Sequence, residues 1–207
     1  MKRAWLLILG LLLLAGCNIL AYPAYLLFGQ PSRTIKAEYA HLADRTVALV
    51  LAGPPAIDFE YPYARNDLGL AVRGALGQHV KNIRLVPQEK VDDLQRSDPA
   101  WLSLGLGEIA AKLGAQRVLY LELVQFTMRE PESINLFRGH IWAEVSVYEA
   151  DASQPHRPSY QTQVQVVHPE QAPLPAGPSA QIAVWRQSLS LFAQELTGKF
   201  YDHKATQ

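Results

Sequence analysis

The segment from Arg117 to Phe126 constrains the fold most, because it is apolar on both sides of an extended chain. Side chains alternate between the two faces of a strand. One face would carry Leu119, Leu121 and Leu123. The other would carry mainly apolar residues too, namely Val118, Tyr120, Val124 and Phe126. A strand that is buried on both faces lies inside a sheet covered on both sides. The segment therefore predicts a central strand in an α/β fold, with helices packed on the sheet.

The remaining segments predict a mixed sheet. Further strands are expected at residues 46–52, 82–86, 139–149 and 160–167. Helices are expected at residues 67–80, 88–95, 104–113 and 179–201. The last of these helices is long and amphipathic, with apolar residues at steps of three and four. Parallel pairing is expected early, across a helical connection, and antiparallel pairing later. The sequence thus predicts one α/β domain over residues 44–202 and a tail of residues 203–207. Loops are expected after residue 52, around Tyr61 to Tyr63, and at residues 169–178.

The N-terminus predicts export. Lys2 and Arg3 precede an uncharged, leucine-rich stretch that runs to Gly16 and ends in Leu14-Ala-Gly-Cys17. A basic start, an apolar segment and small residues before a cut describe a signal peptide, here residues 1–16. The four residues ending at Cys17 resemble the lipobox of bacterial lipoproteins. That resemblance implies cleavage before Cys17, a diacylglyceryl and palmitoyl anchor on its thiol, and a tether over residues 17–43. Two acyl chains suffice for stable membrane attachment.

The residue after the cysteine is Asn18 rather than aspartate. By the same resemblance, this implies an outer-membrane lipoprotein facing the periplasm. The alternative is an uncleaved transmembrane anchor, because the uncharged run from Ala4 to Ser32 exceeds the roughly 20 residues that span a bilayer. Both interpretations place most of the chain outside the cytoplasm, within the cell envelope.

Composition limits the possible functions. The chain has 19 basic and 19 acidic residues, so it lacks the basic excess typical of nucleic-acid binding. One cysteine excludes an intramolecular disulfide and any CxxC site. The six histidines form no HExxH motif, and no GxSxG motif is present. We therefore expect no catalytic residue, metal or cofactor, and no enzymatic activity.

Three weaker patterns have ordinary structural interpretations. Gly105, Gly107 and Ala110 match a loose dinucleotide fingerprint, but they do not follow a strand, so we expect small residues on a packed helix. Glu122 and Glu144 are candidates for a carboxylate pair, with solvent exposure or ion pairing the simpler interpretation. A basic cluster near the first predicted helix is expected to be a solvated face, with a phosphate or lipid-headgroup contact as the alternative; its members are Arg65, Arg73, Lys81 and Arg84.

Aromatic residues are the better candidates for a binding surface. Five of them are expected in loops or on half-exposed strands: Tyr61, Tyr63, Trp101, Phe137 and Trp142. Aromatic side chains are enriched at the energetic centres of interfaces, and they also fill cores. We predict a partner or ligand surface at Tyr61, Tyr63, Trp101 and Trp142.

Three segments resemble a bacterial envelope group. They are Val47–Leu51 closed by prolines, Leu113–Glu122, and Ile141–Asp151, where a strand ends in an acidic turn. Residues 44–200 resemble the α/β domain shared by the N-terminal part of TolB, the curli secretion channel lipoprotein and penicillin-binding-protein activator lipoproteins. The resemblance implies a non-enzymatic accessory lipoprotein that docks onto an envelope complex. We expect neither a propeller like that of TolB nor hairpins that line a pore. The alternative is a lipid- or glycan-binding, transport-auxiliary lipoprotein with a cleft lined by Tyr61, Tyr63 and Trp142.

Overall fold

The structure of the chain is a computed structural model, which describes residues 33–98 and 100–204. The predicted signal peptide, Cys17 and most of the predicted tether lie outside the described residues. The chain divides into two units, one of them Lys36–Tyr201; of the other, the structure describes residues 33–35 and 202–204. In the terminal unit, β1 (Thr34–Ile35) pairs antiparallel with β8 (His203–Lys204).

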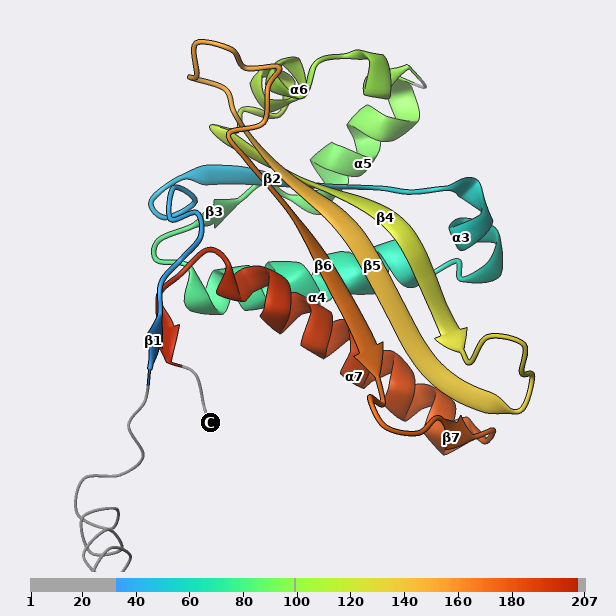
Figure 1. The fold of residues 1–207 in the computed structure, drawn as a ribbon. Coiled ribbons are helices and arrows are strands. Elements are labelled where there is room, and N and C mark those ends of the chain that lie inside the picture. Colours follow the sequence, from blue (N-terminus) through green and yellow to red (C-terminus); the bar gives the residue numbers. More distant parts are fainter. Residues whose placement is uncertain (1–32, 99, 205–207) are drawn as a thin grey trace, which may run out of the picture. The chain divides into compact units, whose positions relative to one another are not determined.

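The main unit is built on a mixed sheet with the strand order β3-β2-β4-β5-β6 (Figure 1). The strands are β2 (Thr46–Ala52), β3 (Arg84–Leu85), β4 (Arg117–Arg129), β5 (Leu136–Glu149) and β6 (Tyr160–His168). Pairing is parallel among β3, β2 and β4, and antiparallel from β4 through β5 to β6. A two-residue strand, β7 (Leu174–Pro175), also pairs with β5. The predicted mixed sheet with β4 inside it is confirmed.

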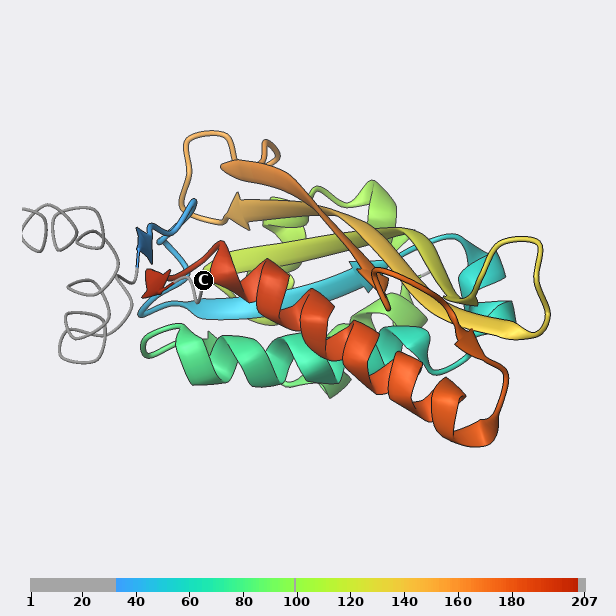
Figure 2. The same cartoon turned by 60° about the horizontal axis from the view of Figure 1, so that its bottom comes forward.

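Helices lie on both faces of this sheet, so the predicted α/β fold is confirmed. They are α3 (Pro55–Glu60), α4 (Ala64–His79), α5 (Gln88–Ser97), a 3-10 helix (Trp101–Ser103), α6 (Leu106–Leu113) and α7 (Pro178–Gly198). Helices α4 and α7 lie side by side against one face, seen from their own side in Figure 2. Helices α5 and α6 lie on the opposite face, above the sheet in Figure 1. In the described part of the chain, no helix combines the length and apolarity needed to cross a membrane.

Strand β2 shows why the sheet has two cores. Val47, Leu49 and Leu51 point into the core beneath α4 and α7. Ala48 and Val50 point into the smaller core beneath α5 and α6. The whole strand after Thr46 is buried. Such a strand gains hydrophobic stabilisation from both layers, which is why its sequence shows an unbroken apolar run rather than alternation.

Several predicted boundaries need correction. The segment after β2 was expected as a loop, but it contains α3, with Pro55 in the first helical position. Proline is tolerated there because the first helical N–H groups have no intrahelical partner in any case. The strand expected at residues 82–86 is reduced to Arg84–Leu85, after which Pro87 precedes α5. The expected linker at residues 169–178 includes β7.

The segment before β2 contributes to the core. Tyr39 and Leu42, which lie in the expected tether, are buried at 6% and 0% exposure. The Tyr39 backbone N–H donates to the Lys199 carbonyl at 3.0 Å, just beyond the end of α7. The compact unit therefore begins before the predicted domain boundary at residue 44.

Candidate functional site

The most distinctive surface of the main unit is a part of the sheet that its helices leave uncovered. Helices α5 and α6 pack over β2 and the start of β4, where Val118 is fully buried. Further along β4, β5 and β6, the side chains on the same face are mostly exposed. We call this surface the open face and define it by Glu122, Gln125, Trp142, Glu144, Gln163 and Gln165. The opposite face of the same strands is buried beneath α4 and α7.

Strand register brings the members of the open face together. Glu122 of β4 is paired with Glu144 of β5, which is paired with Gln163 of β6. One step along, Trp142 is paired with Gln125 on one side and Gln165 on the other. A register shift between Leu123 and Gln125 leaves Val124 40% exposed beside them. The result is a half-buried tryptophan beside two exposed carboxylates on a continuous antiparallel sheet.

The predicted carboxylate pair therefore exists as cross-strand neighbours. Like charges directly opposite each other on adjacent strands destabilise a sheet. Both side chains are exposed, and neither lines the two grooves described below. Acid–base chemistry by a carboxylate pair relies on a site that excludes water, and the open face provides no such enclosure. The arrangement is better suited to receiving a positively charged group from outside.

Aromatic residues border the open face on the side nearest α5 and α6. Tyr120 and Tyr148 pack partly against the core beneath α5 and α6. Burial, followed by the charge of Glu122, raises the pKa of Tyr120 to about 12. The Tyr120 hydroxyl therefore stays protonated over the physiological range, while Glu122 beside it lies exposed.

The predicted aromatic residues do not form one surface. Trp101 and Phe137 were expected to be exposed, but they are buried at 9% and 7% exposure, Trp101 beneath α5 and α6 and Phe137 in the larger core. Tyr63 is 72% exposed, as expected. Trp142 is half-buried on the open face. The burial of Trp101 and Phe137 depends on tertiary packing, which the local alternation of polar and apolar residues does not predict.

The cleft predicted from Tyr61, Tyr63 and Trp142 is not formed. Tyr61 is half-buried against Phe126 and Trp185 on the side of the sheet covered by α7. Its hydroxyl oxygen accepts a hydrogen bond from the Met128 backbone N–H at 3.2 Å. Trp142 lies on the opposite face of the sheet. The two aromatic rings thus belong to different layers.

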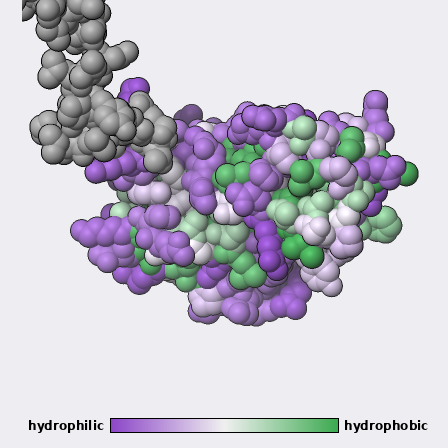
Figure 3. Space-filling view, turned by 90° about the horizontal axis from the view of Figure 1, so that it is seen from below, coloured by the Kyte–Doolittle hydropathy of each residue, from purple (hydrophilic) through white to green (hydrophobic). Residues whose placement is uncertain are grey.

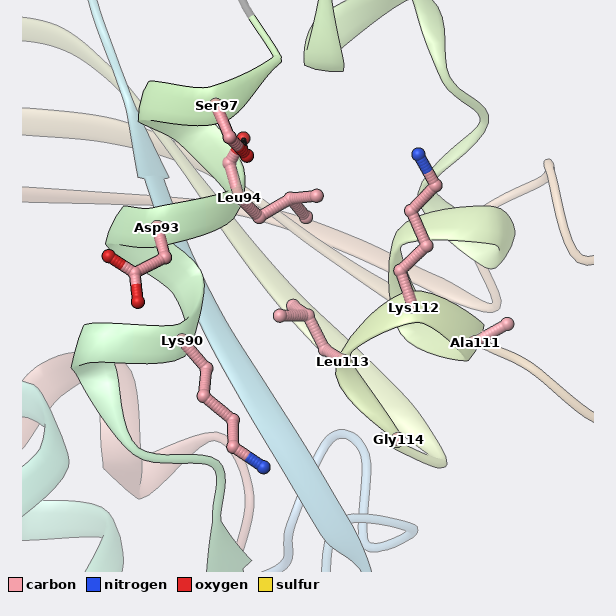
Figure 4. A pocket seen from close by; sticks show the side chains of 8 residues that line it. All are labelled: Lys90, Asp93, Leu94, Ser97, Ala111, Lys112, Leu113 and Gly114. Atoms are coloured by element: carbon pink, nitrogen blue, oxygen red, sulfur yellow. Dashed lines mark hydrogen bonds between the residues drawn. The ribbon is translucent and has the colours of Figure 1, made fainter.

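Two grooves lie elsewhere on the main unit. A groove of about 560 Å³ between α5 and α6 has Leu94 and Leu113 pointing into it, with Lys90 and Lys112 at its sides (Figure 4). A groove of about 740 Å³ between α4 and α5 is lined by Leu51, Arg73 and Trp101, among others. On the side of α4 and α7, apolar and polar side chains are intermixed over the surface (Figure 3). Neither groove is lined by Tyr61, Tyr63 or Trp142.

The glycines of the loose dinucleotide fingerprint have a packing role. A Cβ atom on Gly105 would lie 1.9 Å from Nδ1 of His156, and one on Gly107 would lie 2.6 Å from Cβ of Pro155. The loop between β5 and β6 therefore lies directly on the start of α6. The expectation of small residues on a packed helix is confirmed.

The basic cluster mostly bonds within the main unit. Arg65 forms an ion pair with Asp58, Arg73 donates to the Val86 carbonyl at 2.8 Å, and Arg84 donates to the Thr46 hydroxyl at 3.1 Å. Within the described ranges, no group of three or more His, Cys, Asp or Glu side chains is placed to hold a metal ion.

Sequence reasoning did not join the members of the open face into one surface. Among its members, it singled out Trp142, Glu122 and Glu144, but for different reasons and as separate features. The signal that joins them is the strand register, which depends on where the bulge in β4 falls. Strand β6 alternates in its exposure, with Gln161, Gln163 and Gln165 exposed on the side of the open face.

Comparison with known proteins gives structural likenesses only. A scan of family models and a search of curated proteins find no match. The PelC dodecamer from Paraburkholderia phytofirmans is similar over 80% of this chain and 96% of its own, at 10% identity and a TM-score of 0.45. Lipoprotein GNA1162 from Neisseria meningitidis is similar over 72% and 97%, at 9% identity and a TM-score of 0.40. Protein XCC0632 from Xanthomonas campestris is similar over 77% and 85%, at 14% identity and a TM-score of 0.41. Similarity at TM-scores below 0.5 carries no conclusion about what this chain does, and the resemblance to the TolB group stays a prediction.

Proposed function

We propose that this chain is a membrane-anchored lipoprotein of the bacterial cell envelope that acts without catalysis, as an accessory or assembly component of an envelope complex. Cys17 carries the lipid, and the segment before the main unit sets its reach from the membrane, which is the outer membrane on its periplasmic side. The sequence from Lys2 to Cys17 supports the anchor. The open face supports the protein contact.

The open face is the observation that carries this proposal. Sheets in folded domains are usually covered on any apolar face, and antiparallel sheets tolerate one solvated face when it is polar. Here the solvated face combines a half-buried tryptophan with two opposed carboxylates, Glu122 and Glu144. Tryptophan is enriched at the centres of interfaces. A lysine or arginine from a partner would offset the repulsion between the carboxylates, so a basic partner surface fits best.

Site-specific photocrosslinking in cells tests this contact. A photoreactive phenylalanine analogue replaces Trp142 and preserves an aromatic ring at that position. The control places the same analogue at Gln181, an exposed position on α7. We expect one discrete protein adduct from position 142 and none of that mass from position 181.

Charge variants make the test specific to the open face. Glu144→Lys should abolish the adduct from position 142, because it repels a basic partner. Glu108→Lys, an exposed charge reversal on α6, should leave the adduct intact. Identical adducts from positions 142 and 181, or an adduct that survives Glu144→Lys, would contradict the proposed contact.

A further inference from the structure

The two outer edges of the main sheet are built differently. At one edge, β3 has only two residues, one of them the charged Arg84, and Pro87 lies two residues beyond its end. Short edge strands, charged side chains and prolines are the usual means by which proteins keep a sheet edge from pairing with another chain. The β3 edge is therefore protected.

The edge at β6 is longer and carries fewer of these protections, with Pro169 following its last residue, His168. Strand β6 spans nine residues and pairs with β5 without a register shift, from Tyr160 opposite Val147 to His168 opposite Gly139. Residues 160–167 include no charged residue, proline or glycine. In the described part of the chain, the sheet order ends at β6, which forms its outer edge beside α7 (Figure 2). A long, regular, uncharged edge strand is a template for pairing with another strand.

The composition of β6 favours a second copy of this chain as the occupant. In a two-fold pair, the same surface meets itself, so it must be self-complementary. The exposed residues on one face are Gln161, Gln163 and Gln165. Each amide side chain both donates and accepts hydrogen bonds, so a row of glutamines complements an identical row. No like charges would be brought together.

We propose that two copies of this chain pair antiparallel through their β6 strands, about a two-fold axis, to form one continuous sheet. The other face of β6 carries Thr162, Val164 and Val166, β-branched residues that suit cross-strand packing. The pairing uses Gln163 and Gln165 at the margin of the open face and leaves Glu122 and Trp142 available. It goes beyond the proposed function and does not depend on the lipid anchor.

Cysteine crosslinking of the full chain in its membranes tests the pairing. Gln161→Cys, Gln163→Cys and Gln165→Cys are made one at a time and oxidised with copper phenanthroline. We expect a disulfide-linked dimer of twice the mass, strongest at the position nearest the two-fold axis. The unsubstituted chain controls for Cys17, and Gln181→Cys on α7 controls for random collisions. Dimer yields at all three β6 positions no higher than at position 181, or disulfides only to a different protein, would overturn the proposal.

Charge substitution tests the same contact without a covalent bond. Gln163→Lys together with Gln165→Lys places like charges across the pair, and both residues are exposed, so the monomer should still fold. Light scattering of the detergent-solubilised chain should show its protein mass fall by half. Gln181→Lys with Gln187→Lys adds the same charge on exposed positions of α7 and should leave the mass unchanged. If the unsubstituted chain is a monomer that still crosslinks a partner from position 142, the pairing is refuted while the proposed function stands.

Discussion

At the scale of single residues, Arg117 is the most constrained charge in the main unit. Its side chain is 4% exposed and forms ion pairs with Glu149, at 3.1 Å, and with Asp151. Glu149 also accepts a hydrogen bond from the Tyr39 hydroxyl at 2.5 Å. This network joins the segment before β2 to the start of β4 and the end of β5. A buried charge is costly unless its partners are in place.

Arg117→Met should therefore destabilise the fold by about 3 kcal/mol, because it leaves the Glu149 carboxylate without its cation. Urea unfolding followed by circular dichroism measures the change. The matched control is Arg96→Met, which removes an exposed ion pair with Asp93 whose side chains are 74% and 71% exposed. Arg96→Met should lower the free energy of unfolding by less than about 0.5 kcal/mol. Equal effects of the two substitutions would contradict the role given to the Arg117 network.

The raised pKa values of three tyrosine hydroxyls make the stability of the fold depend on pH in the alkaline range. Burial raises the pKa of Tyr120 and of Tyr160 to about 12, from an ordinary value of 10.0; the charge of Glu122 adds to the first and a hydrogen bond to Glu38 adds to the second. Burial and the hydrogen bond to Glu149 raise the pKa of Tyr39 as well. The folded chain thus keeps protons that the unfolded chain releases.

Stability should therefore be fully present below pH 10 and fall as pH rises from about 10 to about 12. Urea unfolding at a series of pH values, with tyrosinate absorbance recorded in parallel, measures this dependence. Tyr160→Phe should make the decline shallower. A decline of the same steepness in the variant would show that Tyr160 contributes nothing to it.

At the scale of elements, α7 fixes the position of the antiparallel strands. Ser188, which is fully buried on α7, lies against Gly139 of β5. A Cβ atom on Gly139 would lie 2.0 Å from the Ser188 hydroxyl oxygen and 2.8 Å from its Cβ. The strand therefore needs glycine here, since only a residue without a side chain lets the helix approach this closely.

Gly139→Ala should destabilise the fold by about 1–3 kcal/mol, because the added methyl group displaces α7 from β5. The contrasting substitution is Gly74→Ala on α4, where a Cβ atom would meet nothing within 4 Å. It should stabilise the fold by about 0.5–1 kcal/mol, since alanine favours a helix. Thermal unfolding of both variants measures the difference, and a shift of the same sign in both would contradict this packing.

At the scale of the whole molecule, the sequence predicted the buried strands and the helices that cover them better than it predicted the exposed binding surface. Residues 46–52 are recognisable as a strand because both cores impose apolar side chains on it, and its observed bounds match the prediction. Helix α3 was missed because Pro54 and Pro55 at its start resemble a turn, and Phe59 within it is 91% exposed, so no amphipathic pattern marks it.

The candidate site depends on longer-range information. The open face results from where α5 and α6 stop covering the sheet and from the register across β4, β5 and β6. Neither the extent of the helical cover nor the strand register can be predicted from the local alternation of polar and apolar residues. Trp142 could be placed on a half-exposed strand from its neighbours, whereas Trp101 is buried in a core that it shares with residues distant in the sequence, such as Val50.

The measurement that tests the central claim most directly is the intact mass of the chain purified from membranes, compared with that of Cys17→Ser. Lipoprotein processing predicts that residues 1–16 are absent, leaving 191 of the 207 residues with acyl chains on Cys17. The Cys17→Ser chain should retain its full length and carry no lipid. A full-length, unmodified mass for the unsubstituted chain would contradict the account and favour an uncleaved transmembrane anchor.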